Sequence, residues 1–226
     1  MQNEKTSQEK DNFLGKINDF IQRNRKPIFA VTGIIVFLFV GAVVFLAVND
    51  SLNKKAIIKA EEFNTRYEYL TENFDDEDFK DDINGFINDI AAFAGRKKGV
   101  AYSKAWSLAA DLHTRNKDWQ NSQEAWVNAA RAGDNYLAPI AFFNAAAAAE
   151  EQGNIEQAID LLKQCLSLKV EFPAAPRAQF SVGRLYEQLG DFPQALEAYR
   201  EVMINWPEIP VWHQLARSRI IAIEIQ

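Results

Sequence analysis

One long apolar segment lies near the start of the chain. Every residue from Ile28 to Val48 is apolar or glycine except Thr32. As a helix, these twenty-one residues would be about 31 Å long, and the hydrocarbon core of a bilayer is about 30 Å thick. Signal peptides that are removed have apolar stretches of only about 7 to 15 residues. The pattern predicts an uncleaved signal anchor, with one transmembrane helix over residues 27–48.

Charges on the two sides of this segment indicate its orientation. Three basic residues adjoin its amino end: Arg23, Arg25 and Lys26. Positive charge close to a span tends to remain in the cytoplasm. Three lysines soon after the segment weaken the asymmetry. We expect residues 1–26 to be a cytoplasmic head and residues 49–226 to be exported.

The head contains a short amphipathic pattern. Its apolar residues fall on one side of a helix: Phe13, Leu14, Ile17, Phe20 and Ile21. Two interpretations stay open for this predicted helix. It lies against the inner leaflet, or it docks onto a cytosolic or membrane partner.

Beyond the span the pattern is helical almost throughout. Apolar residues recur every three or four positions, at Ala56, Ala60, Phe63, Tyr67, Leu70 and Phe74. This spacing predicts that the first exported helix continues out of the span. Residues 49–100 are therefore expected to form N-terminal exported helices.

The next part of the chain repeats itself. Three turn sequences are followed by equivalent apolar residues, Trp119, Ile155 and Phe192, which lie 36 and 37 residues apart. A fixed period of this length is the sequence signature of stacked helix pairs. We expect three such repeats over residues 101–210.

The clearest unit runs from Pro176 to Pro207. It resembles a tetratricopeptide repeat at these positions: Gly183, Leu185, Tyr186, Gly190, Asp191, Phe192, Ala195, Tyr199 and Pro207. The small residues allow two helices to cross closely, Gly190 permits a tight turn, and Pro207 ends the second helix. The fold class predicted from these patterns is all-α, with an N-terminal single transmembrane helix followed by a tetratricopeptide-repeat helical solenoid.

The segment after the last repeat, residues 211–226, has its own apolar stripe. Ala216, Ile220 and Ile223 predict a terminal helix that caps the exposed end of the solenoid. A second interpretation makes residues 220–223 an edge strand or a self-association surface.

Composition narrows the functional classes. The residues after the span carry 27 acidic and 19 basic side chains, a net charge of −8, which suits neither nucleic acid nor an anionic membrane surface. The chain has one cysteine, Cys165, expected to be a buried thiol, so an intrachain disulfide framework is excluded. No spacing of titratable residues predicts a catalytic, metal or cofactor site. We expect a non-enzymatic binding protein.

The order of segments resembles one family as a whole. A head, a single span, a long exported helix, degenerate repeats and a short terminal helix are similar to the bacterial ancillary SecYEG translocon subunit family, the YfgM-like tetratricopeptide proteins. Local similarity is best over residues 91–130. The resemblance implies an inner-membrane protein with periplasmic repeats. Its partners would be translocon subunits, a membrane-anchored periplasmic chaperone and exported clients.

The first helix of each pair is expected to line a concave groove. Its candidate protein-binding residues are Lys104, Ser107, Asp111, Ile140, Phe143, Arg177, Phe180 and Arg184. In our hypothesis the two phenylalanines provide apolar contacts, and the two arginines hold carboxylates or carbonyls of an extended segment. The alternative is that residues 56–74 fill this groove.

The expected function is that of a chaperone-like adaptor of protein export, anchored in the membrane. A runner-up is an adaptor of envelope assembly or cell division. A third reading is a homo-oligomeric structural organiser of the membrane that has no client.

Overall fold

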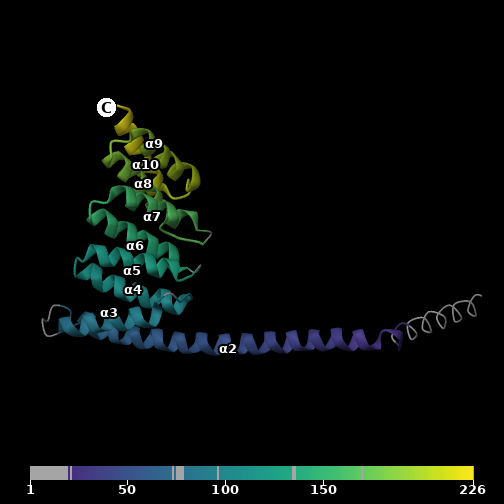
Figure 1. The fold of residues 1–226 in the computed structure, drawn as a ribbon. Helices are drawn as coiled ribbons and strands as arrows, with labels where there is room; N and C mark the ends of the chain where they lie inside the picture. Colours follow the sequence, from purple (N-terminus) through teal and green to yellow (C-terminus); the bar gives the residue numbers. More distant parts are fainter. Residues whose placement is uncertain are drawn as a thin grey trace, which may run out of the picture. The chain divides into compact units, whose positions relative to one another are not determined.

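The computed structural model describes residues 20, 22–72, 74, 79–95, 97–133, 136–168 and 170–225. Every regular element in these ranges is a helix, which confirms the predicted all-α class. The amphipathic segment predicted in the head lies, except for Phe20, outside the described residues. The helices are α2 (Arg25–Glu72), α3 (Lys80–Ala94), α4 (Val100–Arg115), α5 (Trp119–Arg131), α6 (Leu137–Glu151), α7 (Ile155–Ser167), α8 (Ala175–Gln188), α9 (Phe192–Asn205) and α10 (Pro210–Glu224) (Figure 1).

Helix α2 contains both the apolar segment and the residues that follow it, up to Glu72. It is 48 residues long and runs without a break to Glu72, which confirms that the helix continues beyond Val48. By length and composition α2 could cross a membrane, and its apolar stretch is not buried within the chain.

The chain divides into two compact units, residues 1–54 and residues 55–226. In the second unit, the end of α2 packs against α3 and α4. The stripe predicted along α2 supplies this packing, because Phe63 and Leu70 are buried. The remaining buried members of this core cluster are Ile83, Phe86, Ile90, Ala94, Ala105, Ala109 and Leu112.

Helices α4 to α9 form three consecutive pairs, stacked in chain order (Figure 1). The turn inside each pair has one residue with positive φ: Lys117 at 57°, Gly153 at 77° and Gly190 at 76°. These residues lie 36 and 37 positions apart, which is the period read from the sequence. In the first and third turns, Asp118 and Asp191 cap the helix that follows, because each side chain accepts a hydrogen bond from a backbone N–H of that helix.

Small residues bring the helices of the repeats close together. Ala145 and Ala149 of α6 are fully buried and pack in one cluster with Leu162 of α7 and Leu185 of α8. Cys165 is also buried there, as expected, and its Sγ donates a hydrogen bond to the Pro139 carbonyl at 3.1 Å.

Helix α10 packs against α9 and α8 through Ala216 and Ile223, which contact the cluster of Tyr199 and Val202. Residues 220–223 lie inside this helix, so the alternative of an edge strand is wrong.

Candidate protein-binding groove

The predicted groove residues lie on the first helix of each pair. Lys104, Ser107 and Asp111 are on α4, Ile140 and Phe143 are on α6, and Arg177, Phe180 and Arg184 are on α8. The structure divides them into two groups. On α4, Lys104 and Asp111 contact α2, whereas the residues on α6 and α8 contact other parts of the repeats.

Lys104 and Ser107 make contacts that belong to the fold. The Lys104 Nζ donates a hydrogen bond to the Glu61 carboxylate of α2 at 2.8 Å. The Ser107 hydroxyl donates to the Ser103 carbonyl, one turn earlier in α4, at 3.0 Å. Ser103 itself is buried, and its hydroxyl donates to the Ala129 carbonyl of α5 at 2.7 Å.

Asp111 also has hydrogen-bond partners within the fold. The Tyr67 hydroxyl of α2 donates to its Oδ2 at 2.5 Å, and the Arg115 Nε donates to the same oxygen at 2.6 Å. Burial raises the pKa of Tyr67, and the hydrogen bond to Asp111 raises it further. The end of α2 therefore lies along α4, where the alternative interpretation expected residues 56–74.

The contacts on α6 and α8 are of a different kind. The Arg177 guanidinium lies 5.3 Å from the centroid of the Phe143 ring, and the centroid of the Phe172 ring lies 5.9 Å from the same centroid. Ile140, three residues before Phe143, is 41% exposed. We call Ile140, Phe143, Phe172 and Arg177 the α6–α8 patch. It combines apolar side chains with one cation that has no carboxylate partner among the described ion pairs.

Arg184 is held by a carboxylate. Its Nη1 and Nη2 donate to the two oxygens of Glu150 at 2.7 and 2.6 Å, so the pair is bidentate and joins α8 to α6. The hydrogen bond to Glu150 raises the pKa of Arg184 above its ordinary value. A carboxylate from a partner protein would have to displace Glu150 from this arginine.

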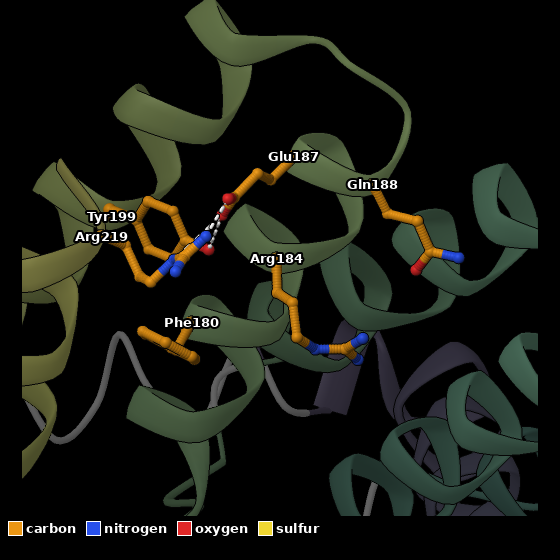
Figure 2. Close-up of a pocket in the computed structure, with 6 residues that line it drawn as sticks. All are labelled: Phe180, Arg184, Glu187, Gln188, Tyr199 and Arg219. Atoms are coloured by element: carbon orange, nitrogen blue, oxygen red, sulfur yellow. Dashed lines mark hydrogen bonds and ion pairs between the residues drawn. The ribbon is translucent and has the colours of Figure 1, made fainter. Parts of the chain in front are cut away.

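Phe180 and Arg184 line a pocket of about 470 Å³ together with four residues that were not predicted for the groove: Glu187, Gln188, Tyr199 and Arg219 (Figure 2). These side chains come from α8, α9 and α10. The Phe180 ring contacts the rings of Tyr199 and Trp212, with centroids 5.1 and 5.6 Å away. Phe180 therefore packs against two aromatic residues of the fold.

One wall of the pocket is a closed polar network. Glu187 accepts a hydrogen bond from the Tyr199 hydroxyl at 3.0 Å and is paired with the Arg219 guanidinium. Burial raises the pKa of Tyr199, and Glu187 raises it further. Figure 2 shows the Arg184 guanidinium pointing away from this network. Arg184 and Gln188, which also line the pocket, are exposed to solvent.

Sequence reasoning missed Arg219 and Phe172 for different reasons. Arg219 lies on a helix interpreted only as a cap, although it follows Arg184 by 35 residues, close to the repeat period. Extending the repeat into α10 would have pointed to it. Phe172 lies in the irregular segment before α8, where no periodic signal exists.

The described residues contain no group of three or more His, Cys, Asp or Glu side chains that could hold a metal ion.

Known proteins resemble the repeat region. Residues 107–169 and 167–208 match the family described as Tetratricopeptide repeat. A "TPR repeat-containing protein" of Treponema pallidum (strain Nichols) is 38% identical over 130 residues, which are 57% of this chain and 54% of that protein. The chain thus spans about half the length of the curated relative it matches.

A crystal structure shows the same fold. The nearly identical TPR-like repeats of a Podosopora anserina protein, described as a kinesin light chain, superpose with a TM-score of 0.52 at 15% identity. The match covers 67% of this chain and 76% of the other. Repeats of this kind build extended concave surfaces and indicate a protein–protein interaction scaffold. Residues 107–208 of this chain are therefore similar to tetratricopeptide repeats, and their helices are arranged as a helical solenoid.

Proposed function

We propose that this protein is a membrane-anchored scaffold that binds an extended segment of a partner protein on the α6–α8 patch. One observation carries the proposal. On α4, Lys104 and Asp111 already bind residues of α2. On α6 and α8, by contrast, an aromatic ring, an exposed isoleucine and a cation lie together. Buried aromatic anchors next to an arginine are the residues that most often dominate binding energy at protein interfaces.

The patch suits a particular kind of segment. A large apolar side chain of the partner would contact Phe143 and Ile140. A carboxylate or a backbone carbonyl beside it would accept hydrogen bonds from Arg177, which can move from the ring without losing an ion pair. Chains that have just crossed a membrane are extended and still expose their apolar residues.

Anchoring is supported by the length and composition of α2 and by the basic residues before it. In this proposal the protein lies in the bacterial cytoplasmic membrane with a cytoplasmic N-terminus and periplasmic repeats. The resemblance to the ancillary SecYEG translocon subunit family extends the proposal to a chaperone-like, non-enzymatic adaptor of protein export. Its partners would then be translocon subunits, a membrane-anchored periplasmic chaperone and exported clients.

Photo-crosslinking in native membranes tests the proposal. A photoreactive amino acid replaces Phe143 in the full chain, and a control carries it at Ile204 of α9, which is 73% exposed. We expect position 143 to capture translocon subunits or emerging exported chains that position 204 does not capture.

Other captures would decide between the remaining functions. Capture of envelope-assembly or cell-division proteins at position 143 would contradict the role in export. It would still support a scaffold that binds partner proteins on the α6–α8 patch. Only copies of the protein itself would favour the homo-oligomeric organiser. Identical captures at both positions would contradict binding at the α6–α8 patch.

A further inference from the structure

A basic loop stands out against the acidic exported part of the chain. Between Gly95 and Gly99, which join α3 to α4, the sequence has three successive cations: Arg96, Lys97 and Lys98. The residues after the span otherwise carry a net negative charge. The loop is therefore a local basic sequence in a domain of opposite net charge.

Lys97 is positioned by two aromatic rings. Its Nζ lies 5.7 Å from the centroid of Phe93 and 5.5 Å from that of Tyr102. Both rings pack against Ala56 and Ala60 of α2. The basic loop therefore lies beside the first turns of α2 in the second unit, where Lys55 is also exposed. We call Lys55, Lys97 and Lys98 the basic edge.

The charge of the basic edge is not neutralised within the described residues. The carboxylates nearest along α2 are engaged with other lysines. These pairs are Asp50 with Lys54 at 2.7 Å, Glu61 with Lys104 at 2.8 Å and Glu62 with Lys59 at 2.6 Å. No ion pair of the basic edge itself is found in the described part of the chain.

The basic edge is close, along the chain, to the apolar segment. Lys55 follows Val48 by seven residues, which is about 10 Å of helix. The headgroup layer extends about 5–7 Å beyond the hydrocarbon core, so the backbone of Lys55 lies just outside this layer. The long lysine side chain can extend back to the headgroups. On the same turn as Lys55, Ile57 and Ile58 are 53% and 61% exposed. Exposed apolar side chains beside lysines are typical of segments that lie at a membrane interface.

We propose that the basic edge binds the anionic headgroups of phospholipids, and so gives the exported unit a second contact with the membrane. This inference rests on the proposed anchoring by α2. It differs from the expectation that the exported part, because of its net charge, does not bind an anionic surface. Charges that lie farther apart than a Debye length of about 8 Å are largely screened. The local charge of a surface therefore affects its binding to headgroups more than the net charge of the whole domain does.

The test uses the full chain in lipid nanodiscs, where both membrane faces are accessible. One set contains only phosphatidylcholine, and the other an equal mixture of phosphatidylcholine and phosphatidylglycerol. The acylation rate of each lysine is measured by mass spectrometry after treatment with an amine-reactive reagent. Lys117 is the internal control, because it is exposed and follows the opposite end of α4.

We expect acylation of Lys97 and Lys98 to be slower by about fivefold in the anionic nanodiscs, and high salt to restore the rate. The rate at Lys117 should be the same in both. In a variant with Lys97→Gln and Lys98→Gln, protection of Lys55 should decrease, whereas Lys117→Gln should leave it unchanged.

Equal acylation rates of Lys97 and Lys98 in the two lipid mixtures would overturn the inference, because headgroup charge would then have no role. Size-exclusion chromatography separately measures whether the chain elutes with the nanodiscs. A chain that does not elute with them would contradict the anchoring by α2, and with it this inference.

Discussion

Gly183 of α8 lies directly against the ring of Tyr199 of α9. A Cβ at position 183 would lie 2.6 Å from Cε1 and 2.7 Å from Cδ1 of that ring. The ring cannot easily move away, because Tyr199 is fully buried and its hydroxyl donates to Glu187 at 3.0 Å. The absence of a side chain at position 183 therefore sets how closely the two helices of the third pair approach.

Gly183→Ala is expected to lower the free energy of unfolding by about 1–3 kcal/mol, because the added methyl group overpacks a rigid site. Denaturant unfolding of the full chain in detergent, followed by circular dichroism, measures this change. A matched control is Gly85→Ala in the interior of α3, where a Cβ would meet no atom within 4 Å.

Gly85→Ala should raise stability by about 0.5–1 kcal/mol, since alanine has the higher helix propensity. If both variants shift stability by the same amount in the same direction, the contact with Tyr199 does not explain the need for glycine at position 183.

The three turns inside the helix pairs allow a test of backbone strain. Lys117 has φ of 57°, a conformation that suits glycine and that the equivalent residues Gly153 and Gly190 adopt. Lys117→Gly should therefore raise the free energy of unfolding by about 0.5–1 kcal/mol.

The reverse exchange should have the opposite sign. At Gly153 a Cβ would meet no atom within 4 Å, so Gly153→Ala changes the backbone preference without a clash. We expect it to destabilise by about 1 kcal/mol. Unchanged midpoints for both variants would contradict the equivalence of the turns.

These turns also show what could be predicted from the sequence. The period of 36 and 37 residues aligned Lys117 with Gly153 and Gly190, and the structure shows positive φ at all three. Local turn chemistry recurs along the chain, so a pattern in the sequence is enough to find it. That the first turn would keep this geometry with a lysine depends on the packing of its flanking helices.

Part of the groove could also be predicted from a pattern in the sequence. Helical spacing indicates which side chains of α4 and α8 share a face, but it does not indicate which other residues pack against that face. The stripe at Phe63 and Leu70 showed that α2 buries one side, whereas its partner helices are set by tertiary packing. The contact of Asp111 with Tyr67 joins residues 44 positions apart, and no periodic signal encodes it.

The cap of α5 gives a pH dependence with a defined sign. Burial raises the pKa of Asp118, but hydrogen bonds from Asn121 and the proximity of His113 outweigh burial, so its folded pKa lies below the ordinary value of 3.8. The carboxylate therefore contributes stability above pH 3.8. This contribution is lost as the pH falls through the folded pKa.

Asp118→Asn keeps a capping side chain but removes this titration. We expect the wild type to lose more stability than the variant between neutral pH and a pH below 3.8, by roughly half a kcal/mol because the carboxylate is partly exposed. Unfolding midpoints of both proteins at the two pH values measure the difference. Equal losses would show that the capping carboxylate is not held below its ordinary pKa.

The two halves of the predicted groove should respond differently to truncation. Asp111→Ala leaves the half-buried Tyr67 hydroxyl and Arg115 without their shared acceptor, so we expect a loss of about 1–2 kcal/mol of stability. Phe143→Ala removes a ring that is partly exposed, and its main expected effect is on binding. Capture of the partner identified by crosslinking should fall at least about tenfold, as for an interface hot spot.

Each effect needs its own readout, because an unstable protein also binds poorly. Stability is measured by unfolding, and binding is measured at a temperature where both variants are folded by circular dichroism. Ile204→Ala is the matched control for Phe143→Ala, since it removes a larger exposed apolar area on α9, outside the patch. If Asp111→Ala reduces capture in the folded state as strongly as Phe143→Ala does, the partner also contacts the part of the groove beside α4. The division of the predicted groove into a structural part on α4 and a binding part on α6 and α8 would then be wrong. The contacts between α2 and α4 would have to break when the partner binds.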